Sequence, residues 1–244
     1  MKGEIPFNSD IDKYGKYVYT GPEARPSSVY ANMRQSELIH TEVRRMHAKR
    51  IFDYGCGDGT YTIELMEIPG VQKVVGYDPA EKAIEIANTR QSEDSNVVFF
   101  DKIEKVQELS TQFDLVIFRG VLHHCLDPQY EIKLASSFAD TIIVLEPNGI
   151  NPILKVIEKL SPYHRAHSER SFTWMRIESW LVNVGFVPQG RKVDLLVPFF
   201  FPTSLIGVMK FMEPFVKKIP YFKWLLLGTQ VITAKRGVSP RQSA

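Results

Sequence analysis

Short apolar runs separated by polar turns and helical patterns make up the middle of the chain. Strands of a parallel sheet appear as continuous apolar runs because both of their faces are buried, and strands that alternate with helices indicate an α/β sheet. Five such runs begin at Ile51, Val74, Val97, Leu115 and Thr141. We expect a sixth strand over residues 185–197 and a last strand over residues 228–236.

Apolar positions three and four residues apart predict the helices. The first covers residues 28–48, with Ser27 or Ser28 as its N-cap and Met33 in its apolar stripe. Later helices are expected over residues 82–90, 127–138 and 172–184. Residues 1–27 are rich in Tyr, Gly and Pro, which indicates a loop or lid ahead of the first helix.

A glycine-rich turn follows the first apolar run. Gly55, Gly57 and Gly59 occupy alternate positions between a strand and the start of a helix. Glycine allows positive φ and close approach of a ligand to the backbone, and nucleotide-like ligands bind at such turns of α/β sheets. A dinucleotide fingerprint needs glycine three residues after its second glycine, but Thr60 stands there. The spacing therefore disfavours a dinucleotide site.

The segment Asp53-x-Gly55-x-Gly57-x-Gly59 resembles the first motif of class I S-adenosylmethionine-dependent methyltransferases. The resemblance is firm over residues 49–146. It implies an α/β, Rossmann-like sheet of seven strands, mostly parallel with the last strand antiparallel, and helices on both faces. It also implies S-adenosylmethionine as cofactor and S-adenosylhomocysteine as product.

Acids end the second and third apolar runs as well. Asp78, followed by Pro79, stands where a carboxylate can accept hydrogen bonds from both ribose hydroxyls; the alternative is that Asp78-Pro79 only starts the next helix. Asp101 stands where the family contacts adenine, and the backbone of Lys102 or Ile103 is an alternative contact.

The remaining cofactor contacts come from the resemblance alone. It assigns the first loop, including Cys56, to the cofactor, and it places the end of the fourth run beside the methionine part. The expected cofactor-binding residues are Asp53, Gly55, Cys56, Gly57, Asp78, Pro79, Asp101, Lys102, Ile103, Arg119 and Gly120.

Four histidines are candidate general bases for a hydroxyl acceptor, because His titrates near neutral pH. They are His123, His124, His164 and His167. His123 and His124 lie in a loop resembling the LHH segment of small-molecule methyltransferases, where the pair more often shapes the loop beside the cofactor. We expect one of the two to pack inward and one to face the cleft. His164 is a base or a contact for an anionic substrate. We expect no metal site, because His164 and His167 lack a carboxylate at a recognisable spacing.

Composition narrows the classes of protein further. The 244 residues are 44% apolar and 24% charged, with a formal net charge of +2, which is ordinary globular composition and does not favour a dedicated nucleic-acid binder. The two cysteines, Cys56 and Cys125, suggest no disulfide framework, and the first residues lack the apolar core of a signal peptide. We expect a cytoplasmic protein.

We expect one domain with two insertions. It comprises a lid and helix (1–48), a cofactor-binding core (49–146), an insertion after the fifth strand (147–171), an apolar insertion (195–227) and a tail (237–244). Pro198 and Pro202 break the second insertion, which is too short to span a bilayer as a helix. Three interpretations remain for it: ordinary core or a homodimer contact, a cap over a hydrophobic substrate, or peripheral contact with a membrane surface.

These features predict a methyltransferase that moves a methyl group to an oxygen or nitrogen atom of a small or lipid-like acceptor by in-line displacement. One alternative is a methyltransferase acting on RNA or protein, since Arg44, Arg45, Lys49 and Arg50 are clustered. Another is a non-catalytic module that keeps the fold and binds partners through its apolar end.

Overall fold

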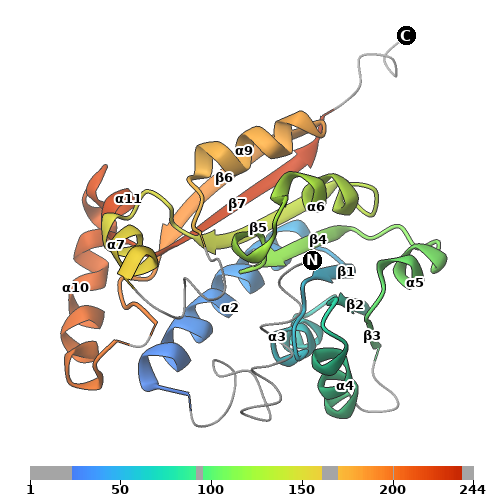
Figure 1. Ribbon diagram of the computed structural model, residues 1–244, viewed down its shortest axis with the longest axis horizontal. Coiled ribbons are helices and arrows are strands. Elements are labelled where there is room, and N and C mark those ends of the chain that lie inside the picture. Colours follow the sequence, from blue (N-terminus) through green and yellow to red (C-terminus); the bar gives the residue numbers. More distant parts are fainter. Residues whose placement is uncertain (1–23, 92–95, 161–169, 200, 238–244) are drawn as a thin grey trace.

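A seven-stranded sheet organises the computed structural model, which describes residues 24–91, 96–160, 170–199 and 201–237 (Figure 1). The strand order is β3-β2-β1-β4-β5-β7-β6. Strands β1 to β5 pair in parallel, and β7 is antiparallel to both β5 and β6. The expected fold class is confirmed. The strands are β1 (Arg50–Tyr54), β2 (Lys73–Tyr77), β3 (Val97–Phe100), β4 (Leu115–Arg119), β5 (Thr141–Pro147), β6 (Phe186–Asp194) and β7 (Thr229–Arg236).

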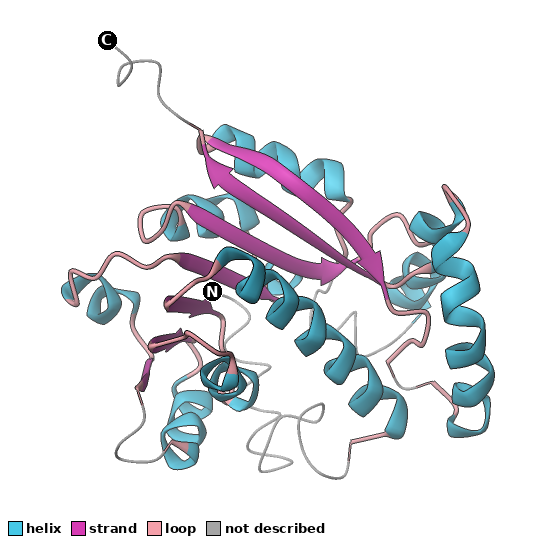
Figure 2. Cartoon of the chain, turned by 180° about the vertical axis from the view of Figure 1, so that it is seen from behind, coloured by secondary structure: helices cyan, strands magenta, loops and turns pink. Residues whose placement is uncertain are grey.

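Helices cover both faces of the sheet because alternate strand residues bury apolar side chains on each side. One core packs α5, α6 and α9 on the sheet, and the other packs α2 and α4 on its opposite face, where the long α2 helix crosses the strands (Figure 2). The helices are α2 (Pro26–Met46), α3 (Thr60–Glu64), α4 (Glu81–Arg90), α5 (Ile103–Glu108), α6 (Pro128–Ala135), α7 (Pro152–Leu160), α9 (Trp174–Asn183), α10 (Ile206–Lys218) and α11 (Phe222–Leu226), with 3₁₀ turns at Leu65–Glu67, Leu122–His124 and Thr203–Leu205.

The start of α2 differs from the expected one. The helix begins at Pro26, whose fixed φ suits the first turn, and the side chain of the N-cap residue, Arg25, makes no capping hydrogen bond. The expectation that Ser27 or Ser28 caps this helix is wrong, because both lie inside it and are buried. Met33 is 48% exposed and does not join the apolar stripe.

Three other elements are shorter than expected. Helix α6 starts as expected, with the carboxylate of Asp127 accepting the N–H of Tyr130, but it ends at Ala135. Helix α9 starts at Trp174 because the Phe172 carbonyl accepts the Gly149 N–H at 3.0 Å and so belongs to the strand edge. Strand β6 ends at Asp194, where the next residue, Leu195, has φ of 69°.

The two insertions lie at the carboxyl-terminal edge of the parallel strands. Helix α7 follows β5, and α10 and α11 fill the connection from β6 to β7 (Figure 1). The side chain of buried Asn148 donates hydrogen bonds to the carbonyls of Trp224 and Leu227, so the first insertion holds the end of the second. No helix in the described part of the chain is long and apolar enough to cross a membrane.

Candidate active site

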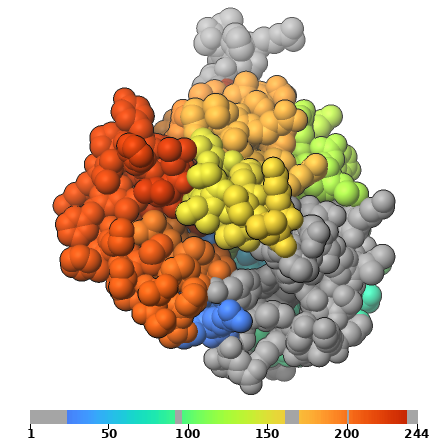
Figure 3. All heavy atoms as spheres, turned by 60° about the vertical axis from the view of Figure 1, so that its left-hand side comes forward, coloured from blue at the N-terminus to red at the C-terminus, as the bar shows by residue number. Residues whose placement is uncertain are grey.

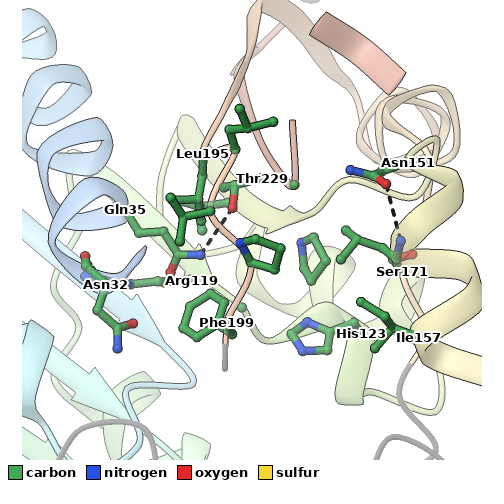
Figure 4. A pocket seen from close by; sticks show the side chains of 18 of the residues that line it. Asn32, Gln35, Arg119, His123, Asn151, Ile157, Ser171, Leu195, Phe199 and Thr229 are labelled. Atoms are coloured by element: carbon green, nitrogen blue, oxygen red, sulfur yellow. Dashed lines mark hydrogen bonds between the residues drawn. The ribbon is translucent and has the colours of Figure 1, made fainter. Parts of the chain in front are cut away.

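A cavity of about 740 Å³ opens at the carboxyl ends of β1, β4 and β5, between α2, α7 and α10 (Figure 4). This is the edge of an α/β sheet where ligands generally bind. Its polar wall contains seven of the predicted site residues together with Tyr61. They are Asp53, Gly55, Cys56, Arg119, Gly120, His123 and His124.

The glycine loop after β1 needs glycine for conformation and for space. Gly55, Gly57 and Gly59 have φ of 81°, 55° and 74°, which residues with a side chain rarely adopt. A Cβ on Gly55 would lie 2.5 Å from the side chain of Val121, and one on Gly59 would lie 2.7 Å from Phe99. The loop therefore packs tightly against its neighbours while its backbone borders the cavity.

The carboxylate of Asp53, the last residue but one of β1, lies in a nearly water-free position. It is 5% exposed and accepts a hydrogen bond from Thr62 Oγ1 at 2.6 Å. Burial raises its pKa to about 6, although the Thr62 hydrogen bond and the charge of Arg119 act in the opposite direction. A cation placed beside this group would favour its ionised form.

Arg119 ends β4 and is fixed by α2. Its guanidinium donates to Ser36 Oγ at 3.0 Å and to the Asn32 carbonyl at 2.9 Å, and Cζ lies 3.7 Å from the centre of the Tyr61 ring. Burial lowers the pKa of Arg119, yet a guanidinium stays charged throughout the working pH range. The cavity wall thus carries a fixed positive group and an acid near one another.

Asp78 connects β2 to the glycine loop. Its Oδ2 accepts the Gly57 N–H at 3.0 Å and its Oδ1 accepts the Ala80 N–H at 2.9 Å. This geometry is compatible with both roles expected for Asp78, which are ribose binding and the start of the next helix. The carboxylate faces the loop and also fixes the turn into α4. Asp78 and Pro79 lie beside the cavity rather than in its wall. The ribose role of Asp78 and the cofactor contact of Pro79 stay predictions.

The predicted adenine residues lie farther out, after β3. Asp101 is paired with Lys105 at 2.9 Å, and this hydrogen bond lowers the pKa of Asp101. Lys102 is exposed, while Ile103 begins α5 and packs against the core. None of the three lines the cavity, so their cofactor roles stay predictions.

A buried carboxylate orients His123. Glu146, which is 0% exposed at the end of β5, accepts the backbone N–H groups of Val121 and Leu122 at 2.8 and 2.7 Å through Oε1. Its Oε2 lies 2.7 Å from Nδ1 of His123. Because Glu146 is an acceptor in all three contacts, Nδ1 donates and Nε2 is the basic nitrogen. His123 points into the cavity in Figure 4.

Glu146 is a site residue that was not predicted from the sequence. The available signal was an acid at the end of the fifth apolar run, as at the ends of the earlier runs. His124 packs against His123, with ring centroids 3.8 Å apart and ring planes tilted by 42°, and both line the cavity. The expectation that one of them packs inward is therefore not met. His164 and His167 lie outside the described residues, as do residues 1–23 of the expected lid.

Most of the remaining lining is apolar, and seven further residues add polar or charged groups to it. These are Asn32, Gln35, Asn151, Glu158, Arg170, Ser171 and Thr229. Residues of α7, α10 and the stretch after β6 form the apolar wall, so both insertions contribute to one site. The apolar lining residues of the two insertions are Ile153, Leu154, Ile157, Leu195, Leu196, Val197, Pro198, Phe199, Phe201, Met209, Met212, Val216 and Leu226. Among the described residues, no three His, Cys, Asp or Glu side chains are grouped as metal ligands.

The polar wall fits S-adenosylmethionine. Its methionine part carries an amine and a carboxylate, which match the acid of Asp53 and the guanidinium of Arg119. Gly57, with φ of 55°, donates its N–H to Asp78 and so holds the glycine loop against the end of β2.

Residues 51–149 match the family model of a methyltransferase domain. The chain contains a methyltransferase domain. This match confirms the methyltransferase that the motifs predict, and the observed sheet is the expected class I fold.

Two curated relatives and one solved enzyme illustrate the similarity. A ubiquinone biosynthesis O-methyltransferase from Agrobacterium fabrum is 32% identical over 33% of this chain, and a tRNA U34 carboxymethyltransferase from Campylobacter hominis is 27% identical over 41%. The matches span 32% and 38% of those relatives. The magnesium protoporphyrin IX methyltransferase of Synechocystis PCC 6803, with bound S-adenosylhomocysteine, shares the fold: its TM-score is 0.64 at 18% identity, over 96% of this chain and 97% of that one.

Proposed function

We propose that this protein is an S-adenosylmethionine-dependent methyltransferase that methylates a hydroxyl oxygen of an apolar, lipid-like acceptor. One observation carries the proposal: His123, which buried Glu146 orients, lines a cavity that carries Asp53 and Arg119 on one wall and is mostly apolar elsewhere. The domain family supports the reaction class, and the cavity supports the choice of acceptor.

Asp53, Arg119 and the glycine loop hold the cofactor in this proposal. Arg119 pairs with the methionine carboxylate, and Asp53 faces the positive end of the same moiety. Asp78 accepts hydrogen bonds from the ribose hydroxyls. When bound, S-adenosylmethionine supplies a methyl group whose bond to sulfur breaks as the bond to the acceptor oxygen forms, leaving S-adenosylhomocysteine.

His123 takes the acceptor's proton at Nε2. The carboxylate of Glu146 fixes the ring through Nδ1 and stabilises the imidazolium that results. General-base catalysis of this kind contributes about 10²- to 10⁴-fold in rate. The surrounding apolar side chains exclude water and align the acceptor, which reduces the entropic part of the barrier.

The apolar wall supports a hydrophobic acceptor over an RNA. The basic cluster near the start of β1 lies at the opposite end of that strand from the cavity, and two of its members have acidic partners: Arg45 pairs with Glu42 and Arg50 with Asp114. We therefore assign this cluster no role in binding the acceptor.

Calorimetric titration with S-adenosylmethionine and S-adenosylhomocysteine tests the cofactor part. We expect micromolar binding of both, and loss of both in Gly57→Val, because a β-branched side chain does not tolerate the positive φ that this position of the glycine loop requires. Gly190→Val is the matched control, since a Cβ there meets no atom within 4 Å. Unchanged affinity in Gly57→Val would place the cofactor elsewhere.

A further inference from the structure

An apolar surface covers the outer sides of α7, α10 and α11. We call it the outer apolar face. Phe211 is 71% exposed, Phe215 57%, Phe222 58% and Leu160 72%. Such large exposed groups on neighbouring helices are uncommon in a monomer surface and mark an interaction site. The face comprises Ile153, Val156, Leu160, Val208, Phe211, Met212, Phe215, Ile219, Tyr221, Phe222 and Leu225.

Helix α10 presents apolar residues on two sides. Its inner side buries Ile206 and Val216 against the rest of the protein. Its outer side carries Val208, Phe211 and Phe215, which are three and four residues apart and therefore lie on one helix face. Core packing accounts for the inner stripe only, and the outer stripe needs another partner.

Positive charge borders this face. Residues 195–227 contain four lysines and a single acid, Glu213. Glu213 is 4% exposed and pairs with Lys217 at 2.7 Å, so it contributes no negative charge to the surface. Lys210 and Lys218 are exposed on the same helix. Aromatic and aliphatic side chains flanked by lysines are typical of helices that lie in a membrane interface.

The outer apolar face continues into the cavity. Ile153 of α7 and Met212 of α10 are each about half exposed on that face, and each also lines the cavity. In Figure 3 the yellow atoms of α7 lie directly against the orange and red atoms of α10 and α11, so the three helices form one surface beside the opening. A long apolar molecule can therefore pass from the outer apolar face to His123 while it contacts apolar side chains.

We propose that the outer apolar face docks on an anionic lipid bilayer and that the acceptor enters the cavity from that bilayer. The entry of the acceptor from the bilayer rests on the proposed function, whereas the docking of the face on the bilayer does not. A second copy of the chain fits this face less well than a bilayer does. A two-fold interface on this face would bring its lysines close to those of the partner, and like charges disfavour such contacts.

Vesicle flotation of the full-length protein tests the docking. We expect flotation with vesicles of phosphatidylcholine and phosphatidylglycerol, and much weaker flotation with phosphatidylcholine alone. Lys218→Glu lowers the partition coefficient on the mixed vesicles by about fivefold or more, as expected for loss of a basic residue near an anionic surface. Lys133→Glu, an exposed lysine on α6, is the matched control and leaves flotation unchanged.

The double variant Phe211→Ser/Phe215→Ser removes apolar contact without touching the cavity wall. We expect its partition coefficient to fall by on the order of tenfold or more, while cofactor affinity and the circular dichroism spectrum stay those of the unchanged protein. Val182→Ser, which replaces a 55% exposed valine of α9, is its control. With a lipid extract in the vesicles and labelled S-adenosylmethionine, methyl incorporation falls in the double variant and not in Val182→Ser.

Three results would overturn the docking. One is no flotation with either vesicle by a protein that binds S-adenosylmethionine, which leaves the proposed function intact. Another is equal flotation of the double variant and the Val182→Ser control. The third is a dimer in sedimentation that becomes a monomer in the double variant with flotation unchanged, which would assign the face to a second copy. Flotation by a protein that binds no cofactor would instead contradict the proposed function alone.

Discussion

At the scale of single residues, the buried carboxyl of Asp53 lowers the free energy of unfolding when it is ionised. Its pKa is raised to about 6 by burial, whereas an unfolded Asp titrates near 3.9. Between these values the folded protein binds more protons than the unfolded chain, so this group makes the free energy of unfolding decrease as pH rises from about 4 to 6. Above pH 6 the cost is about 3 kcal/mol.

Asp53→Asn should therefore stabilise the protein at pH 7 by up to about 3 kcal/mol, because the amide has no charge to desolvate. Near pH 4 the gain should shrink toward zero, since the native carboxyl is then protonated. Urea unfolding at the two pH values measures both numbers. A gain of equal size at both would show that the burial of charge is not its cause.

His123 and Glu146 form the pair with the sharpest catalytic prediction. His123→Gln should lower kcat by about 10²- to 10⁴-fold and leave the affinity for S-adenosylmethionine unchanged, because the base acts on the acceptor. Glu146→Gln should lower kcat with little change in KM for the cofactor, since it acts by orienting His123. Labelled methyl transfer into a lipid extract measures both. His124→Gln is the comparison, and an equal loss there would contradict the assignment of the base.

At the scale of elements, the turn from β5 into α7 holds the second insertion in place. The side chain of Asn148 donates to the carbonyls of Trp224 and Leu227, at 2.7 and 2.8 Å, and Asn151 donates to the Leu226 carbonyl at 3.0 Å. The last turn of a helix has carbonyls without partners inside the helix. Two asparagines of one insertion therefore satisfy the end of α11 in the other.

Asn148→Ala should lower the free energy of unfolding by about 1–3 kcal/mol, because it leaves buried carbonyls without a donor. Urea unfolding measures the loss, and amide exchange should increase over residues 222–227. Asn183→Ala, at the exposed end of α9, serves as the control. If exchange rises evenly over the whole chain instead, the contact does not act locally.

At the scale of the whole molecule, the cofactor site connects strands from the middle of the sheet, so ligand binding should stabilise the domain as a unit. S-adenosylhomocysteine at about 100 times its Kd should add about 2.7 kcal/mol. For a chain of this size each kcal/mol raises Tm by about 2–4 °C, which gives an expected rise of about 5–10 °C. Thermal unfolding monitored by fluorescence checks this. Gly190→Val should show the same rise and Gly57→Val none.

The local sequence determined the strands, the glycine loop and most helix positions. Apolar runs specify buried strands because backbone pairing and burial of both faces are local requirements. Gly55, Gly57 and Gly59 were identifiable because their positive φ excludes other residues, and this loop with the strand-end acids was enough to predict the family. The resemblance to that family then placed Asp53, Arg119 and the His123–His124 pair in the candidate site.

Only the tertiary structure decided which side chains act together. Glu146 is 23 residues from His123 in sequence, and the parallel pairing of β4 with β5 brings them together. Helix α9 starts later than its sequence pattern predicts, because Phe172 pairs with the chain after β5. No local pattern in the sequence indicates this contact. The cavity likewise required two insertions, separated by a strand and a helix, to meet at one edge of the sheet. Sequence patterns report short-range conformational preference, whereas a site depends on long-range contacts that form only when the sheet assembles.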